Sequence, residues 1–128
     1  MSTASEVGTY LAAHGLGTVG TSIFEGLMPA SPANCIGILE RAGRGPERTM
    51  GRLVAVKPHV HIEVRNDDYE AGYAVALQIQ TLLQNFTGLM GSVRYYEITI
   101  MGAINSLGVD ENQRSRFTQT FIVTKEPS

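Results

Sequence analysis

Hydrophobic and polar residues alternate most clearly just before the middle of the chain. Val60, Ile62 and Val64 are apolar, and the residues between them are polar. Successive side chains of a strand point to opposite faces, so this alternation predicts a strand over residues 60–65 with one buried face and one wet face.

The longest helix of the chain is predicted to follow directly, over residues 67–85. Asn66, Asp67 and Asp68 offer side-chain oxygens to the free N–H groups of a helix start, and Asp67 with Glu70 has capping-box spacing. A stripe of apolar residues recurs at helical spacing. Its members are Gly72, Val75, Ala76, Ile79, Leu82, Leu83 and Phe86. Such a helix would be about 28 Å long, enough to cover one sheet.

A second, narrower line of residues runs beside the polar face of this helix. It consists of Tyr73, Leu77, Gln80 and Gln84, at spacings of four, three and four. One interpretation is that Tyr73 and Leu77 lie under a loop of the same chain. The other is a contact with another subunit, because interfaces favour aromatic over charged residues. The line is therefore a candidate subunit interface.

The pattern before the central strand predicts one helix and one hairpin. Residues 3–14 read as a helix, with Thr3 and Glu6 at capping-box spacing. Residues 22–28 and 35–40 read as two strands joined by a broad, proline-containing loop.

The pattern after the central helix predicts a turn over residues 87–92 and a strand over 93–101. In that strand Tyr96, Ile98 and Ile100 share one side, and Tyr95, Glu97 and Thr99 share the other. Residues 102–114 read as a polar connection. Residues 115–125 read as the last strand, with Phe117, Phe121 and Val123 alternating with threonines. The whole order predicts an α+β fold, a mostly antiparallel sheet with both helices packed on one face.

The segment 41–57 breaks these patterns and carries half of the ten basic residues. They are Arg41, Arg44, Arg48, Arg52 and Lys57. Gly43, Gly45, Pro46 and Gly51 argue against a rigid element there, although residues 53–56 could form a short edge strand. The segment is either a solvated surface loop or a basic contact loop that meets phosphate or an acidic partner.

Bulk composition narrows the class of protein. The 128 residues suffice for one domain, expected to span 1–128, and a net charge of −2 gives no overall attraction to nucleic acid or membrane. The single cysteine, Cys35, is expected to be a small buried residue. The sequence shows neither a signal peptide nor a stretch of membrane-spanning length, so a soluble, intracellular or particle-borne domain is expected.

Signals for catalysis are weak, and neither an enzyme nor a cofactor is expected. Residues 15–20 spell G-x-G-x-x-G, but a helix is predicted before them and a strand after them, the reverse of a dinucleotide site. His59 and His61 lie near Glu63 on the wet face of a strand, which would suit Zn²⁺ only with a further ligand.

Three stretches together resemble the tail terminator and minor capsid proteins of long-tailed bacteriophages. They are residues 23–29 through 34–40, residues 61–71, and residues 108–114 leading into Phe117 and Phe121. In that family a strand ends in Arg, as at Arg65, and Tyr-Glu opens the long helix. A Gly-x-Asp-x-x-x-Arg loop near the end then precedes a strand that carries Phe.

The resemblance implies a structural virion protein without an active site. Family members are implied to form a ring, probably of six subunits, on the head-proximal end of the tail tube. That ring stops tube polymerisation and provides the surface for head–tail joining. The implied partners are other copies of the chain, the tail tube protein, a head-closure or connector protein, and genomic DNA in passing. The implied location is the virion tail, with the host cytoplasm during assembly.

In a head-to-tail ring each subunit needs two different complementary patches. The helix line is a candidate for one patch, and Asp110, Glu111 and Arg114 supply either a charged contact or a cap for the hairpin. Three alternatives stay open: another connector component such as a head-closure or tail-tube protein, a nucleic-acid-binding module using residues 41–57, and a small metalloenzyme.

Overall fold

The computed structural model describes residues 2–26, 28–29, 33–49, 52–110 and 113–126, and for residues 41–54 it describes the backbone alone. The elements in chain order are α1 (Thr3–Ala13), β1 (Ile23–Glu25), β2 (Cys35–Thr49), β3 (Arg52–Asn66), α2 (Tyr69–Leu83), β4 (Gly88–Met90), β5 (Val93–Ile100), β6 (Asn105–Val109) and β7 (Ser115–Lys125).

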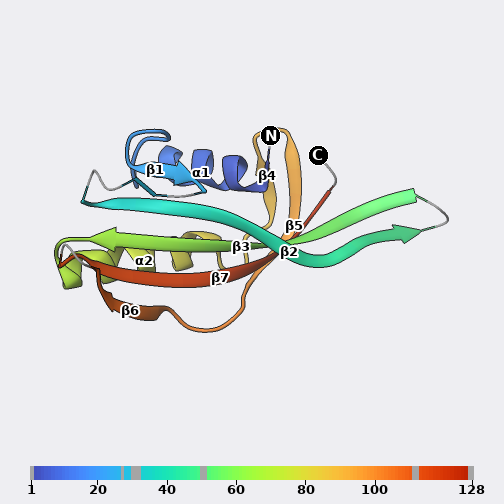
Figure 1. Ribbon diagram of the computed structural model, residues 1–128. Coiled ribbons are helices and arrows are strands. Elements are labelled where there is room, and N and C mark those ends of the chain that lie inside the picture. The colour runs from blue at the N-terminus through green and yellow to red at the C-terminus, as the bar shows by residue number, and fades with distance from the viewer. Residues whose placement is uncertain (1, 27, 30–32, 50–51, 111–112, 127–128) are drawn as a thin grey trace.

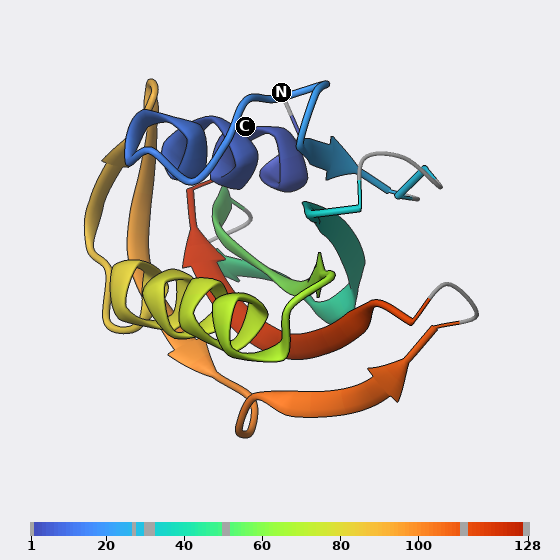
Figure 2. The same cartoon turned by 90° about the vertical axis from the view of Figure 1, so that its left-hand side faces the viewer.

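The strands form one curled sheet in the order β1-β2-β3-β7-β5-β4, with β6 also paired to β7. Every strand pairing is antiparallel except that of β1 with β2. Both helices lie on the same face of the sheet (Figures 1 and 2). The predicted α+β class is confirmed.

The core lies between the two helices and the central strands β3 and β7. Val60, Ile62 and Val64 are each at most 3% exposed, and the register sets them beside Phe121, Gln119 and Phe117 of β7. From the helices, Val7, Leu11, Ile79 and Leu83 enter the same cluster. The alternations predicted for residues 60–65 and 115–125 are confirmed except at Arg65 and Thr118, which are buried, and Cys35 is buried as expected.

The long helix, predicted over residues 67–85, is two residues shorter at each end, and its cap is one residue later than predicted. Asp68 is the N-cap, and its carboxylate accepts a hydrogen bond from the backbone N–H of Ala71 at 3.0 Å. The N–H of Asp67 instead donates to the side chain of Asn34, and Asn66 accepts from the N–H of Asp68. These two bonds fix the bend before the helix, so the proposed capping box is wrong. The apolar stripe is confirmed by the buried Gly72, Ala76, Ile79 and Leu83.

The first helix is also capped by an unexpected residue. Ser2 is the N-cap of α1 and accepts from the N–H of Ser5, so the capping box of Thr3 and Glu6 is wrong. The physical reason is that Glu6 points inward, where its carboxylate binds Lys125 and Tyr95.

Three strand predictions need correction. The strand at residues 22–28 is only Ile23–Glu25, and it pairs parallel to β2, not as a hairpin. The turn at 87–92 contains β4, which pairs with β5. A shift in the register of β5 between Tyr95 and Glu97 moves the buried side to Val93, Tyr95 and Ile98 and leaves Tyr96 45% exposed. A bulge of this kind inserts one extra residue and reverses the alternation beyond it.

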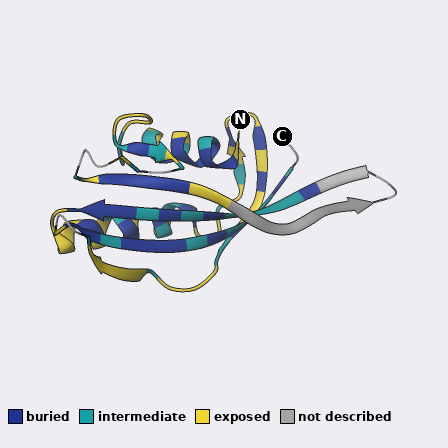
Figure 3. Ribbon diagram, viewed as in Figure 1, coloured by how far each residue is buried: buried dark blue, intermediate teal, exposed yellow. Residues whose placement is uncertain are grey.

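The polar connection predicted at 102–114 is wrong as well, because it contains β6. All five residues of this strand are exposed, so it carries no alternation of burial that a sequence pattern could report. Figure 3 shows β6 exposed along its length.

The basic segment is not a loop, because its backbone continues the hairpin of β2 and β3. The two strands remain paired from Arg41 opposite His59 to Thr49 opposite Arg52. Three register shifts interrupt this pairing between Arg41 and Arg48, and such irregularities accommodate glycine and proline. The expected separate edge strand at 53–56 is part of β3. We call residues 41–57 the arm, and it projects beyond both helices in Figure 1.

Candidate functional site

The outer line of α2 is accessible at its N-terminal half. Tyr73 and Leu77 are 39% and 40% exposed, so the described part of the chain places no loop over them. Gln80 is used inside the subunit, because its Oε1 accepts from Nε2 of the buried Gln119 at 3.0 Å. Gln84 is exposed and is the C-cap of α2. Tyr73 and Leu77 are therefore the accessible apolar members of the predicted line, and Gln84 is an accessible polar one.

The Asp110–Arg114 turn is built from its own charges. Asp110 accepts from the backbone N–H of Arg114 at 2.9 Å and from its Nε at 2.8 Å. The N–H of Asp110 donates in turn to the Arg114 carbonyl. Both side chains are at most 14% exposed, so this pair closes the β6–β7 hairpin, whereas Glu111 lies outside the described residues.

The helix line and the β6–β7 hairpin lie side by side. Phe117 of β7 packs edge-on against the rings of Tyr69 and Tyr73, with centroids 5.1 and 5.8 Å away. Phe117 also pairs with Ser106 of β6, and Ser115 pairs with Val109. Paired residues project to the same face of a sheet, so Val109 and Ser106 project to the side that α2 covers.

Exposed apolar side chains gather where these elements meet. Tyr69 and Val109 are 51% and 58% exposed on the side of the sheet that α2 covers, where Tyr73 and Leu77 are also accessible. We call these four residues the α2–β6 surface. The sequence pattern did not single out Tyr69 and Val109, because their segments were assigned to helix capping and to a loop. Clustered apolar exposure of this kind marks interaction sites.

The free edge of β6 adjoins this surface. Within the described residues β6 pairs only with β7, so its other edge presents unpaired N–H and C=O groups. Edge strands are normally protected by charged residues, proline or bulges. Residues 105–109 contain no charge and no proline, and their protection is limited to one register shift at Leu107.

The arm supplies a different kind of surface at the other end of the sheet. It carries five basic side chains and one acid, a net charge of +4, which leaves −6 for the remainder of a chain that totals −2. Asp67, Asp68 and Glu70 are exposed where β3 turns into α2, at the end of the sheet opposite the arm (Figure 1). The molecule is thus electrostatically polar along the sheet.

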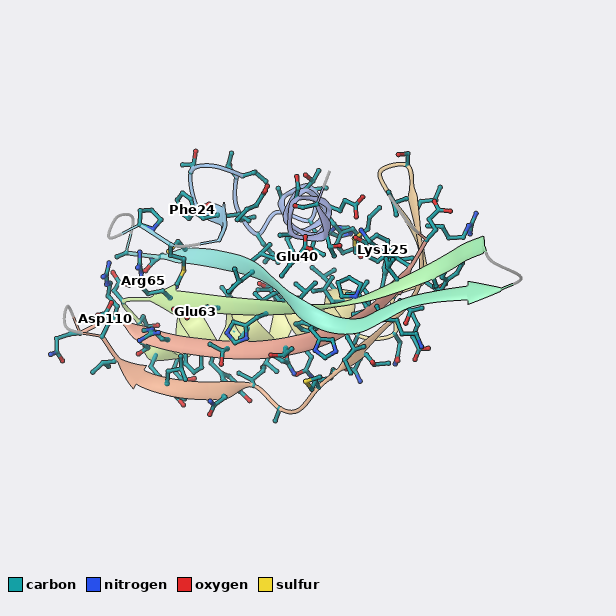
Figure 4. All side chains as sticks on the ribbon, turned by 45° about the vertical axis from the view of Figure 1, so that its right-hand side comes forward. Phe24, Glu40, Glu63, Arg65, Asp110 and Lys125 are labelled. Carbon is teal, nitrogen blue, oxygen red and sulfur yellow. The ribbon has the colours of Figure 1, made fainter. Side chains whose placement is uncertain are left out.

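A buried charged cluster holds α1 onto the sheet. Lys125 Nζ lies 2.7 Å from Glu6 Oε1, and the Tyr95 hydroxyl donates to the same oxygen at 2.6 Å. All three residues are at most 5% exposed. Burial, with the hydrogen bond to Glu6, raises the pKa of the Tyr95 phenol far above its ordinary value of 10.0. Figure 4 places Lys125 near α1, at the opposite end of the sheet from Asp110.

The residues considered for metal binding are engaged elsewhere. Glu63 forms an ion pair with Arg116 at 3.1 Å, and a ring nitrogen of His61 lies 3.1 Å from the Thr120 hydroxyl. Among the described residues, no group of three or more His, Cys, Asp or Glu side chains could hold a metal ion. Neither described helix is long and apolar enough to cross a membrane.

The fold is shared with solved structures. A chain from the virion of a native gene transfer agent particle aligns over 98% of this chain and 96% of its own length, with a TM-score of 0.73 and 14% identity. A second solved chain, with no stated function, aligns over 97% and 90%, with a TM-score of 0.59 and 9% identity. These identities show the fold alone, and no curated protein matches the chain.

The fold is thus one that also occurs in the virion of a gene transfer agent particle. The family described as bacteriophage tail terminator protein matches residues 10–127. The chain therefore belongs to the bacteriophage tail terminator family and is a structural protein of the phage tail. The family resemblance inferred from the sequence is confirmed.

Proposed function

We propose that the protein is the tail terminator of its particle, a single domain over residues 1–128 that forms a ring on the head-proximal end of the tail tube. The ring caps the tube, stops its polymerisation and offers its other side to a head-closure or connector protein. The observation that carries this proposal is the family match over residues 10–127. The separate α2–β6 surface and arm support it, because a ring needs two different complementary patches.

Deletion of the gene tests this function directly. Electron microscopy of the resulting particles should show filled heads separate from tails, and tails of abnormal, variable length. A mutant that still carried only joined particles with tails of normal length would contradict the proposal.

The behaviour of the purified protein separates a terminator from a tube protein. A terminator should stop at one closed ring, for which we expect six subunits. Unlimited filaments in electron micrographs of the purified chain would identify a tube protein instead.

The exposed part of the helix line is proposed to contribute to the ring contact. The double variant Tyr73→Ala/Leu77→Ala should assemble more weakly, because both side chains are exposed in the single subunit and would lose apolar contact area. Sedimentation velocity over a concentration series measures this. Assembly with wild-type affinity would exclude this patch.

A further inference from the structure

We propose that the arm of one copy docks on the α2–β6 surface of the next copy, its β2 strand lying along the free edge of β6. This inference rests on the proposed function in that it names the contact that joins neighbouring subunits of the ring. It is carried by the open strand edges, by the exposed apolar residues beside β6 and by the distribution of charge.

The arm has few strand partners within its own subunit. β1 pairs with β2 only at Ile36–Ile38, and the pairing of β7 with β3 ends at Val56 opposite Lys125. Beyond these points the arm is a ribbon of two strands, and such a ribbon is marginally stable in water. A third strand, supplied from outside, would give the backbone of β2 partners along its open edge.

β6 has an open strand edge with which the arm of another copy can pair. Its outer edge is unpaired within the described residues, all five of its residues are exposed, and none is charged. Val109 projects from β6 to the side that α2 covers, where Tyr69 and Tyr73 are exposed, so a docked strand would also cover apolar area. β6 is about 17 Å long at 3.4 Å per residue, and the nine residues of β2 in the arm are long enough to span it.

The arm and the remainder of the chain carry opposite net charges. The arm carries +4 and the remainder of the chain −6. The exposed Asp67, Asp68 and Glu70 begin α2 beside the apolar surface, so arginines arriving on a docked arm would meet opposite charge. The arm and these acids lie at opposite ends of one molecule (Figure 1). Each copy can therefore give its arm to one neighbour and receive an arm from the other, which is the head-to-tail arrangement of a ring.

Site-specific photocrosslinking tests the inference without assuming a strand register. A benzophenone amino acid placed at Val109 should crosslink to a second copy in assembled particles and in concentrated purified protein. Mass spectrometry should place the attachment within residues 41–49. The matched control is the same probe at Leu89, which is 57% exposed against 58% for Val109 but lies on β4. Its crosslinking to the arm should be at least about tenfold weaker.

Two further variants strengthen the test. Arg44→Glu/Arg48→Glu should reduce crosslinking from position 109, and Val109→Lys should weaken self-association at least about tenfold, since it sets an added charge in an apolar contact. Leu89→Lys should leave self-association unchanged. Far-ultraviolet circular dichroism and thermal unfolding confirm that each variant is folded.

Several results would overturn the inference. They are crosslinks from position 109 no stronger than those from position 89, crosslinks to another segment of the second copy, or crosslinks only to the tail tube protein. Salt-dependent duplex binding that is lost in the arm variant, with no crosslink from position 109 to the arm in the unmodified sequence, would make the arm a nucleic-acid contact instead.

The deletion phenotype keeps this inference separate from the proposed function. Variable tails without the crosslink to the arm would leave a terminator whose subunits meet elsewhere. A crosslink from position 109 to the arm, together with normal tails in the deletion mutant, would support the docking contact and contradict the terminator role.

Discussion

The buried ion pair between α1 and β7 gives the most quantitative prediction of this structure. Replacing Lys125 with Met removes the cation 2.7 Å from Glu6 and keeps a side chain of similar length. The Glu6 carboxylate, 4% exposed, would then keep the Tyr95 hydroxyl as a partner but lose its counter-charge. Removing one member of a buried pair costs roughly 3–5 kcal/mol, because the other charge stays buried and unpaired.

The size of this loss is large for a domain of this length. Domains are commonly stable by only about 5–15 kcal/mol, so Lys125→Met should remove about a fifth or more of the free energy of unfolding. With a urea dependence of about 2 kcal/mol per molar, the unfolding midpoint should fall by roughly 1.5–2.5 M. Urea titration followed by circular dichroism measures this.

Two further variants isolate the cause. Glu6→Gln/Lys125→Met removes both charges, retains an acceptor for the Tyr95 hydroxyl, and should recover at least half of the loss. Arg116→Met removes the cation of a second pair, whose side chains are 36% and 21% exposed, and it should cost at most about 1 kcal/mol. The reasoning is refuted if Lys125→Met costs no more than Arg116→Met, or if the double variant is the least stable of the three.

Three other predictions follow from contacts of single residues. Because the folded-state pKa of Tyr95 is raised, the contribution of Tyr95 to stability should be constant below pH 10 and should fall above it by up to about 1.4 kcal/mol per pH unit. Urea titrations of Tyr95→Phe should lack that part of the slope. Asp110→Ala should cost about 2 kcal/mol in urea unfolding, because the buried Arg114 loses its ion pair, and an unchanged midpoint would contradict the described turn. Gly72→Ala should lower the melting temperature measured by calorimetry, although replacing glycine with alanine usually stabilises a helix. The reason is that the added Cβ would lie 3.0 Å from the ring of Phe117, which two tyrosine rings flank.

The family and the central elements were readable from local sequence. The strand that carries Val60, Ile62 and Val64, the apolar stripe of α2 and the last strand all have one face in the core. Burial of one face imposes an apolar repeat of two residues in a strand and of 3.6 residues in a helix. The spacing of apolar residues within each of these elements therefore predicts it. The same local signals predicted the α+β class, and the resemblance to tail terminators was carried separately by three short stretches of sequence.

Elements without one-sided burial could be placed only by the tertiary structure. β6 is exposed at all five residues and is held by its pairing with β7. The arm reads as a loop because glycines and Pro46 interrupt its pattern, yet its strands stay paired through register shifts. β1 is likewise held by its parallel pairing with β2, and the direction of that pairing is not visible in the local sequence pattern. These are the parts of the chain from which the proposed contact between subunits is built.

The role of single side chains divides in the same way. The spacing of Tyr73 and Leu77 set them off the buried stripe but left open whether a loop of the same chain covers them, and in the structure both are exposed. The sequence pattern assigned Glu6 to a helix cap, since the partner that draws Glu6 inward, Lys125, lies 119 residues away. Local spacing determines which face of an element is apolar. Which distant groups meet on that face, and which strand edges stay open, is decided only when the sheet closes.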